Sequence, residues 1–421
     1  MGAGAAGLMA AIWAARSASA SERRVVVLDG ARVLGAKILV SGGGRCNVTH
    51  HAVDETAFNG STPPAIRKVL RRFDVERTIA FFREIGVLLK REDTGKLFPV
   101  TDRARTVLDA LLTAARDAGV TLQHPWRVAT MTRDVSGFVL TSASGETLRA
   151  GRVVLATGGR SLPKTGSDGG GYVLATSLGH SLTERIFPAL VPLVVPEGHF
   201  VRRLSGLSAP VTLEVRLASG RKRAAVTGSL LCTHFGLSGP AVLDVSRHLL
   251  DARLDDPGAQ LVVRWIPERD AASLDTELRT LGGASVGGYV AGRLPDRLGR
   301  ALCAEAGVDP ATPGHRLSRD ERRALVQAMT EMTVPIAGDR SYGVAEVTAG
   351  GVPLREVHLD TLRSRVCPGL SLCGEICDVD GRIGGFNFQW AWASGHVAGS
   401  SAWLPDREAE HGVTATPVAR P

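Results

Sequence analysis

The sequence predicts an α/β protein built around a Rossmann-like dinucleotide-binding domain, with a β-rich domain and a small helical module inserted in its middle. Three observations predict this fold class. The run Gly2-Ala3-Gly4-Ala5-Ala6-Gly7 opens an apolar segment with helical character. A short apolar strand over 24–28 follows and ends in Asp29. Between residues 189 and 335, strand-like alternation gives way to helical spacing.

The opening glycines have the GxGxxG spacing of a phosphate-binding turn. Gly2 and Gly4 let the backbone bend tightly and approach a pyrophosphate, while Gly7 lets the helix pack closely on the sheet. The pyrophosphate then binds the free N–H groups at the helix start, around Ala5 and Ala6. Asp29 is placed to hold ribose hydroxyls, which favours a cofactor without a ribose phosphate, such as FAD or NAD.

The strand that normally precedes this turn is not present in the sequence, because only Met1 stands before Gly2. Either the start has been set too late and a strand of about five residues is missing, or the fold has lost its central strand. We favour the first explanation. Losing that strand would expose apolar faces and unpaired backbone groups on both neighbouring strands of a parallel sheet.

Length and composition are those of a soluble globular protein. A chain of 421 residues, 44% hydrophobic and 22% charged, is enough for two or three domains. Its net charge of +8 suits phosphate-bearing ligands or nucleic acid, although an Arg-rich composition alone gives the same value. No transmembrane span or cleaved leader is evident, so we expect a cytoplasmic protein.

The cysteines predict reduced thiols rather than disulfides or a metal site. Six of them are dispersed along the chain without a CxxC pair. Cys373 and Cys377 lie four apart but have no companion His or Cys pair, so we expect no bound metal and interpret them as small buried hydrophobic residues.

A glycine loop follows the first strand. Three consecutive glycines cannot form a stable helix or strand interior, so 41–49 is predicted to be a loop that gives a ligand access to the backbone. Ser41, Arg45 and Asn47 flank the glycines and supply donors for an anionic or carbonyl-rich ligand. A plain surface loop is the alternative.

This loop carries a family resemblance. Lys37-Ile38-Leu39-Val40-Ser41-Gly42-Gly43-Gly44-Arg45-Cys46-Asn47 resembles the K-I-x-x-S-G-G-G-R-C-N block of a bacterial FAD-binding family that includes the BaiN-like reductases and the aminoacetone oxidase-like flavoproteins. The resemblance implies FAD as cofactor. Cys46 lies near the flavin on this basis, but because no partner thiol accompanies it, we interpret it as a packing residue.

The next segments alternate between helical and strand patterns. Helical spacing covers 62–90 and 103–118, and a hairpin is predicted over 138–151. An apolar strand over 152–156 then ends in Thr157-Gly158-Gly159. The resemblance implies that this turn returns to the FAD domain beside the pyrophosphate and that Val128 lies near the adenine.

The inserted region, from Ala189 to about Pro335, is predicted to be a substrate-side or cap domain, β-rich and then helical. Strand patterns cover 211–217 and 261–265. His234 lies between them in a segment that resembles a further family block. It is either an acid or base, since its pKa is near neutrality, or a structural residue that caps the following helix.

The last third contains the longest match. Residues 369–373 form a predicted strand that ends in Gly374-Glu375, where a carboxylate is placed to hold polyol hydroxyls. The segment 374–395 resembles the family block G-E-x-x-D-V-D-G-x-x-G-G-Y-N-F-Q-W-A-W-x-S-G, with Phe386 in place of Tyr. Gly384 and Gly385 open a helix whose first amides could face the flavin N1 and C2 carbonyl. Trp390 and Trp392 are interpreted as packing residues.

Together these segments predict an FAD-binding domain in two parts, 1–188 and 336–404, interrupted by the inserted domain 189–335 and followed by a disordered tail, 405–421. The expected cofactor-binding residues come from both parts: Gly2, Gly4, Ala5, Ala6, Gly7, Asp29, Lys37, Ser41, Gly42, Gly43, Arg45, Cys46, Asn47, Val128, Thr157, Gly158, Gly159, Gly374, Glu375, Asp380, Gly384, Gly385, Phe386 and Asn387.

The predicted function is that of an FAD-dependent oxidoreductase, of reductase or amine oxidase type, acting on a small molecule by hydride transfer through the flavin N5. NAD(P)H or oxygen is the electron partner; a second glycine fingerprint for a nicotinamide cofactor is absent from the sequence. The alternatives are an FAD-dependent RNA-modifying or RNA-binding protein, suggested by the positive charge, and a flavin-binding regulator without turnover. The scattered Lys and Arg residues argue against nucleic acid. No catalytic acid or base is assigned.

Overall fold

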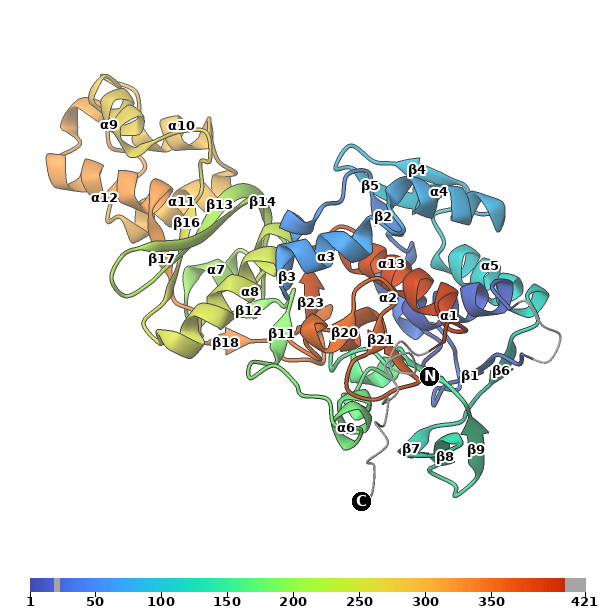
Figure 1. Ribbon diagram of the computed structural model, residues 1–421. Coiled ribbons are helices and arrows are strands. Elements are labelled where there is room, and N and C mark those ends of the chain that lie inside the picture. Colours follow the sequence, from blue (N-terminus) through green and yellow to red (C-terminus); the bar gives the residue numbers. More distant parts are fainter. Residues whose placement is uncertain (19–22, 406–421) are drawn as a thin grey trace, which may run out of the picture. The chain divides into compact units, whose positions relative to one another are not determined.

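The computed structural model describes residues 1–18 and 23–405 (Figure 1). Apart from Pro405, the tail predicted to be disordered lies outside the described residues. The chain forms two compact units, one made of Met1–Ile186 and Ala349–Pro421 and the other of Phe187–Thr348. The sequence had placed the second boundary at 335/336. The inserted unit extends further because β18 (Gly338–Asp339) pairs with β12 (Leu193–Val194) in the same sheet.

The first unit is built on parallel strands from both ends of the chain. β1 (Val26–Leu28) pairs in parallel with β6 (Thr121–Gln123), and β10 (Val153–Leu155) pairs in parallel with β22 (Leu370–Leu372). Antiparallel β21 (Arg363–Ser364) and β20 (Val357–His358) extend the second sheet. Val and Leu make up β1 and β10 and dominate β22, and the buried side chains of these three strands belong to the core of the unit.

Met1 and Gly2 lie between the two parallel pairs. The Met1 amino group donates to the Val154 carbonyl at 2.7 Å, and the Met1 carbonyl accepts the N–H of Ala156 at 2.9 Å. On the other side, the Gly2 N–H donates to the Leu28 carbonyl at 2.8 Å. Met1 and Gly2 therefore lie where the strand before the turn lies in a dinucleotide-binding unit.

Two helices from opposite ends of the chain pack side by side (Figure 1). α1 (Ala5–Arg16) is apolar almost all round, as a fully buried helix must be. α13 (Phe386–Ser400) approaches it closely through two glycines. A Cβ added at Gly395 would lie 2.5 Å from the Ala6 carbonyl oxygen, and one at Gly399 would lie 2.3 Å from that of Ala10. Only glycine allows this approach.

The remaining elements of the first unit surround this core. The helices predicted over 62–90 and 103–118 are present as α3 (Pro63–Leu70), α4 (Val75–Glu84) and α5 (Ala104–Asp117). The predicted hairpin belongs to a three-stranded antiparallel sheet. The unit also contains α2 (Ala36–Gly44), α6 (Gly170–Ser177), β2 (Thr49–His50), β3 (Phe58–Gly60), β4 (Leu89–Arg91), β5 (Lys96–Pro99), β7 (Val128–Asp134), β8 (Gly137–Ser142), β9 (Thr147–Ala150) and β23 (Val379–Gly381).

The inserted unit has a sheet of seven strands in the order β17-β16-β13-β14-β15-β12-β18, in which the neighbouring strands are antiparallel. Its two long strands are β13 (Ser208–Arg216) and β14 (Lys222–Thr233). α8 (Pro240–Asp255) packs on them and contributes Val242, Val245 and Leu249 to a separate core. The sheet also contains β15 (Gly236–Ser238), β16 (Gln260–Arg264) and β17 (Met332–Val334). The helices are α7 (Phe200–Arg203), α9 (Ala271–Arg279), α10 (Val286–Ala291), α11 (Asp296–Glu305) and α12 (Arg319–Thr330), and β11 (Phe187–Ala189) pairs with β19 (Val347–Ala349).

The six cysteines are free and buried. Within residues 1–18 and 23–405, no helix combines the length and the apolar character needed to cross a membrane. No group of three or more His, Cys, Asp and Glu side chains is arranged to hold a metal ion in this part of the chain.

Candidate functional site

The turn before α1 has the geometry that phosphate binding requires. Gly2 has φ +92°, and a Cβ there would lie 2.4 Å from the Ala156 carbonyl oxygen. A Cβ at Gly7 would lie 1.8 Å from the Gly2 carbonyl oxygen. At Gly4, by contrast, a Cβ would meet no atom within 4 Å. Two glycines therefore let the turn close, and the third leaves open space at the helix start.

The N-terminus of α1 is uncapped. Gly4 is its N-cap residue, no side chain bonds to it, and the first turn contains no acidic residue. The first N–H groups of a helix have no partner within the helix. Those of Ala5, Ala6 and Gly7 therefore point into the space above Gly4, together with the positive end of the helix dipole. This space, the candidate anion site, has the donors and the helix dipole that favour an anion.

Asp29 holds the turn in place from the end of β1. Its Oδ2 accepts the N–H of Ala3 at 2.6 Å, and its Oδ1 accepts the N–H of Ala31 at 2.7 Å. Each carboxylate oxygen keeps further acceptor capacity for a hydroxyl. Val128, at the start of β7, follows Trp126, whose N–H donates to the Asp29 carbonyl at 2.6 Å. The structure thus brings the predicted ribose and adenine residues together.

The turn after β10 lies beside the same glycines. A Cβ at Gly2 would lie 3.3 Å from the Thr157 Cα, and Gly158 has φ +75°. Among the described residues, Thr157 Oγ1 and Ser167 Oγ are buried atoms without a hydrogen-bond partner. A Cβ at Gly158 would lie 2.7 Å from that Ser167 hydroxyl. Unpartnered polar atoms cluster next to the candidate anion site.

Residues from the last part of the chain reach the same place. Lys37 Nζ lies 2.5 Å from Glu375 Oε2, and both side chains are about three-quarters or more buried. A Cβ at Gly374 would lie 2.7 Å from the Ala6 Cβ. Segments that are more than 300 residues apart in sequence therefore meet at the N-terminus of α1.

The glycine loop is adjacent to the N-terminus of α13. α2 is broken at its end, because Ser41, Gly42 and Gly43 have non-helical angles, the two glycines in the left-handed region. Beyond this loop, a Cβ at Gly385 would lie 2.6 Å from the Thr49 carbonyl carbon. α13 is likewise uncapped, with Gly385 as N-cap residue and no acid in its first turn. The two longest family-like blocks therefore lie together, as the sequence predicted.

Buried side chains of α13 fix this arrangement. The Trp392 indole N–H donates to the Val48 carbonyl at 2.8 Å, and the Trp390 indole N–H donates to the Gly374 carbonyl at 3.0 Å. Gln389 Oε1 accepts the Thr49 hydroxyl at 2.7 Å. The two tryptophans are buried, so their interpretation as packing residues is confirmed, and their N–H groups also tie the two site loops to one helix.

Several of the expected cofactor residues direct their side chains elsewhere. Arg45 Nη1 pairs with Glu92 Oε1 at 2.6 Å, and its guanidinium lies 4.0 Å from the centre of the Phe98 ring. The guanidinium is therefore engaged by a carboxylate and an aromatic ring in this structure, and its expected role as a donor to an anionic or carbonyl-rich ligand stays a prediction. Cys46 is fully buried, and burial raises the pKa of its thiol to about 12, so it stays protonated.

Three further residues, all from the segment 374–395, direct their side chains to other parts of the protein. The Asn387 amide both donates to the Gly381 carbonyl and accepts the Gly381 N–H, each at 2.8 Å. The Asp380 side chain is buried at the β23–β3 pairing. Phe386 is 2% exposed and therefore offers little side-chain surface to a ligand. These residues shape the site through the backbone that they hold.

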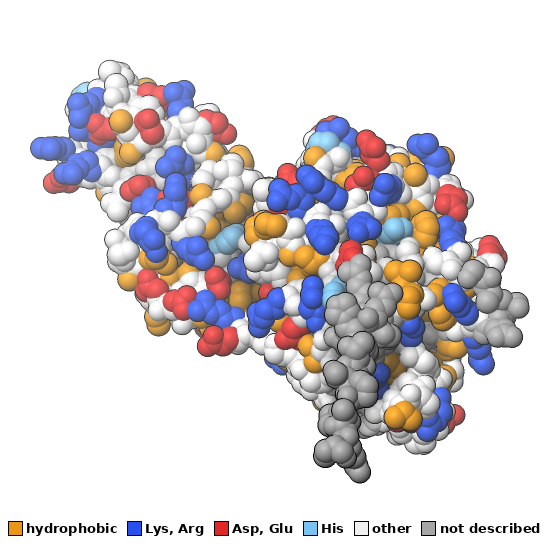
Figure 2. Space-filling view, viewed as in Figure 1, with side chains coloured by type: hydrophobic (Ala, Val, Ile, Leu, Met, Phe, Trp, Pro, Cys, Tyr) orange, Lys and Arg blue, Asp and Glu red, His pale blue; other side chains and the backbone are white. Residues whose placement is uncertain are grey.

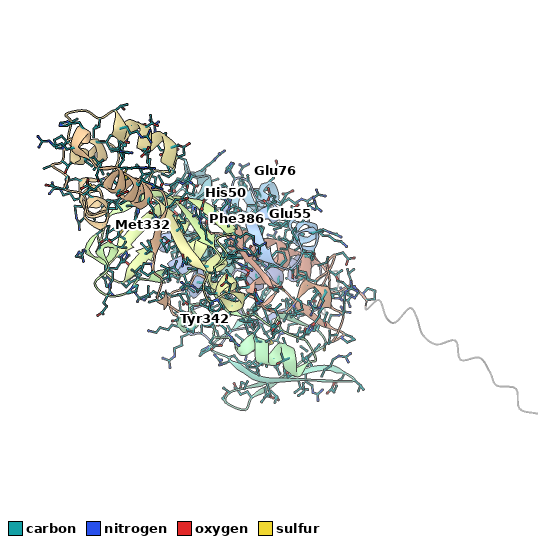
Figure 3. All side chains as sticks on the ribbon, turned by 90° about the vertical axis from the view of Figure 1, so that its left-hand side faces the viewer. His50, Glu55, Glu76, Met332, Tyr342 and Phe386 are labelled. Carbon is teal, nitrogen blue, oxygen red and sulfur yellow. The ribbon has the colours of Figure 1, made fainter. Side chains whose placement is uncertain are left out.

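His50 was not singled out from the sequence. Its ring stacks on Phe386 with centroids 5.0 Å apart, so that the two side chains lie together beside the N-terminus of α13 (Figure 3). Burial lowers the pKa of His50. The only available signal was the His50-His51 pair directly after the glycine loop, and two histidines in a loop do not by themselves indicate a site.

The chemistry of these residues fits FAD. An uncapped helix with open space over Gly4 suits the pyrophosphate, Asp29 suits the ribose, and a second uncapped helix suits the electron-rich edge of the flavin. Asn47 Oδ1 is a further buried acceptor without a partner in the described part of the chain. A dinucleotide with several polar groups along its length would satisfy these atoms.

Comparison with known proteins identifies the family. The family model of the HI0933-like protein Rossmann domain matches residues 1–401. The chain belongs to the HI0933-like family. This confirms the resemblance drawn from the sequence and, with it, the Rossmann-type FAD-binding fold with an inserted domain. As a member of the HI0933-like family, the chain is an FAD-dependent oxidoreductase.

Two curated relatives align over nearly the whole chain. One is a 3-dehydro-bile acid delta(4,6)-reductase of Clostridium scindens, 35% identical, with 96% of this chain and 98% of that protein covered. The other is a ribosomal RNA dihydrouridine synthase of Escherichia coli, 33% identical, with 94% of each covered. A 3-ketosteroid delta1-dehydrogenase from Sterolibacterium denitrificans shares the fold, with a TM-score of 0.50 and 13% identity over 94% of this chain and 97% of that one.

His234, in the inserted unit, does not have the second of the two roles considered for it, and its role as an acid or base stays a prediction. It is exposed in the turn between β14 and β15, and its backbone carbonyl accepts Arg202 Nε at 2.7 Å. The N-cap of α8 is Gly239, with no side-chain cap bond, so His234 does not cap this helix.

Proposed function

We propose that the protein reduces a carbon–carbon double bond that is conjugated to a carbonyl group. The observation that supports this most strongly is the chemistry shared by the names of two relatives. A 3-dehydro-bile acid with double bonds at positions 4 and 6 is a conjugated enone. Uridine differs from dihydrouridine by one double bond, which is conjugated to a ring carbonyl. The two substrates differ greatly in size, but the bond that is reduced is the same in kind.

The redox balance of this reaction requires a two-electron donor. A hydride adds to the β-carbon of the enone and a proton to its α-carbon. A bound FAD would supply this chemistry, because its N5 can carry a hydride equivalent from NAD(P)H to the substrate. The role of the protein in this reaction is to hold the cofactor and to form the surface on which substrate and nicotinamide bind in turn.

The described residues support that role. The first N–H groups of α1 would hold the pyrophosphate, and Asp29, which accepts the Ala3 N–H of the turn, would also hold a ribose. The first N–H groups of α13 lie where negative charge on a reduced flavin ring would be stabilised. Phe386 and the two tryptophans are buried side chains of this helix and hold it in the protein core.

A small-molecule enone is the first substrate candidate, and uridine in ribosomal RNA is the second. The second is favoured by the relative named for that reaction and by the charge of the chain. Most of the excess positive charge lies in the first unit, where Lys68, Arg71 and Arg72 are exposed at the end of α3. Figure 2 shows Lys and Arg side chains gathered over this part of the surface.

The test is an anaerobic titration of the flavin-loaded protein. NADH or NADPH should bleach the visible flavin band, and a 3-oxo steroid with a double bond at position 4 should restore it. The saturated 3-oxo steroid should not restore it and serves as control. Bleaching by an amine, combined with reoxidation by oxygen but by no enone or uracil, would refute the proposal in favour of an amine oxidase.

The two substrate candidates separate in a parallel experiment. Ribosomal RNA transcripts and NADPH are incubated with the protein, and dihydrouridine is measured by mass spectrometry of the digested RNA. Binding of RNA that weakens steeply with salt would accompany turnover if RNA is the substrate. Reduction of the steroid enone with no dihydrouridine would assign the protein to small molecules.

A further inference from the structure

Asn47 has a buried polar atom that the chain does not satisfy. The residue is 8% exposed, and within the described residues its Oδ1 is buried without a hydrogen-bond partner. Leaving a buried acceptor unpaired costs folding free energy, so such atoms are rare unless a ligand or water completes them.

The backbone on both sides holds Asn47 in place. Cys46 has φ +62° in the left-handed region, and its N–H donates to the Ser41 carbonyl at 3.0 Å. The Val48 N–H donates to the Leu97 carbonyl at 2.9 Å, while the Val48 carbonyl accepts the Trp392 indole N–H. A non-glycine residue in the left-handed region is strained and is kept only where the surroundings impose it. These bonds fix the backbone position from which the Asn47 carboxamide projects.

Asn387 shows what the chain does with an asparagine that has a structural role. Both of its amide atoms pair with the backbone of Gly381 at 2.8 Å. Asn47, at the same site, has no such backbone match for Oδ1 among the residues that the structure describes. The contrast indicates that the Asn47 amide is reserved for a ligand.

The chemistry of the amide selects the ligand group. A carboxamide offers an acceptor beside a donor, and its complement is a donor beside an acceptor. An imide, O=C–NH–C=O, presents this edge, and the flavin ring of FAD carries one around N3. The pyrophosphate is accounted for at the N-terminus of α1 and the ribose at Asp29, whereas the loop that ends in Asn47 meets α13.

We infer that the Asn47 carboxamide binds an imide edge, with Oδ1 accepting the imide N–H, and that this edge belongs to the flavin ring of FAD. Uracil carries the same imide edge, so the experiment separates the two sources. The inference requires only that FAD binds and does not depend on which substrate is reduced. Its failure is therefore distinguishable from failure of the proposed function.

The test compares FAD with FAD methylated at N3, which lacks the imide N–H. Apo-protein is titrated with each flavin and the dissociation constants are measured by fluorescence. The wild type should bind FAD about tenfold or more tightly than the methylated form, as expected for one buried hydrogen bond. In Asn47→Ala the ratio should fall to about one, because the group that contacts N3 is gone.

Asn387→Ala is the matched control. It removes an amide of the same kind from the same site, so it should weaken both flavins equally and keep the wild-type ratio. If Asn47→Ala folds poorly, Asn47→Asp replaces it. That variant keeps an acceptor for the N–H but repels the neighbouring carbonyl, so it should bind FAD more weakly while still preferring it over the methylated form.

A wild-type ratio near one, or a ratio that survives in Asn47→Ala, would overturn the inference. A second arm titrates the flavin-loaded protein with uridine and with N3-methyluridine. If the Asn47 substitution removes discrimination between these nucleosides and leaves the flavin ratio unchanged, the imide belongs to a uracil and the assignment to FAD is wrong.

Discussion

Gly4 and Gly7 should separate cofactor binding from folding when each is replaced by alanine. At Gly4 the new Cβ meets no atom within 4 Å, and the backbone angles are ordinary for alanine. At Gly7 the Cβ would lie 1.8 Å from the Gly2 carbonyl oxygen, whereas ordinary contact begins at 3.4 Å. The first substitution places a methyl group in the space for the pyrophosphate, and the second forces the turn apart.

The expected magnitudes follow from these contacts. Gly4→Ala should change the free energy of unfolding of the apo-protein by about 1 kcal/mol or less, since only an N-cap preference is lost. Its FAD affinity should fall about a hundredfold, because two charge-assisted hydrogen bonds of about 1.5 kcal/mol each are lost. Gly7→Ala should cost about 3 kcal/mol of stability through overpacking, which corresponds to a decrease in Tm of about 6 to 12 °C.

The assay pairs thermal unfolding of the apo-protein with a fluorescence titration of FAD. Gly151→Ala serves as the control, since a Cβ there also meets no atom within 4 Å and Gly151 is not among the expected cofactor-binding residues. If Gly4→Ala binds FAD as tightly as the wild type, the pyrophosphate does not lie at the N-terminus of α1, and the account of the site is wrong.

Three further predictions concern buried charges and thiols. Burial lowers the pKa of His396 and of His248 from 6.5 to about 4. Below pH 6.5 these histidines bind protons in the unfolded chain but remain neutral in the folded chain. Each of them should therefore lower the free energy of unfolding by up to about 3 kcal/mol as the pH falls to 4. Urea unfolding at a series of pH values measures this loss, and His396→Phe should remove about half of the pH dependence that the two histidines cause. Glu375→Gln should weaken the pair with Lys37 and cost about 1 kcal/mol by urea unfolding, and an equal loss in a Lys37→Met background would show that the two residues are not coupled. A thiol reagent at pH 8 should leave the native protein unmodified and react with all six cysteines after denaturation, because burial keeps thiols such as Cys46 protonated; rapid labelling of the native protein would contradict the buried placement.

The sequence predicted those features of the fold that depend on local pattern. The glycine spacing before α1 indicated a phosphate turn because glycine alone permits the contacts at Gly2 and Gly7. The family-like blocks indicated that Gly385 and the glycine loop share a site, and the structure places them together. Periodicity indicated the helices α3 to α5 and the strands of the inserted sheet.

Features that depend on long-range partners could not be predicted. The sequence around Arg45 does not indicate that its guanidinium pairs with Glu92, 47 residues later. The amides of Asn47 and Asn387 look equivalent in sequence, and only the position of Gly381 makes one of them structural. The end of the inserted unit was placed too early because a two-residue strand such as β18 has no periodicity to detect.

The packing of α13 against α1 sets the order in which the chain can mature on the ribosome. Ala6, Met9 and Ala10 emerge early, but the helix that covers them contains residues 386–400. At a synthesis rate of about 5 to 20 residues per second, α13 is synthesised about 20 to 80 s after α1. During that interval the apolar face of α1 is accessible to chaperones. In a chain truncated before Gly395, this face would remain exposed.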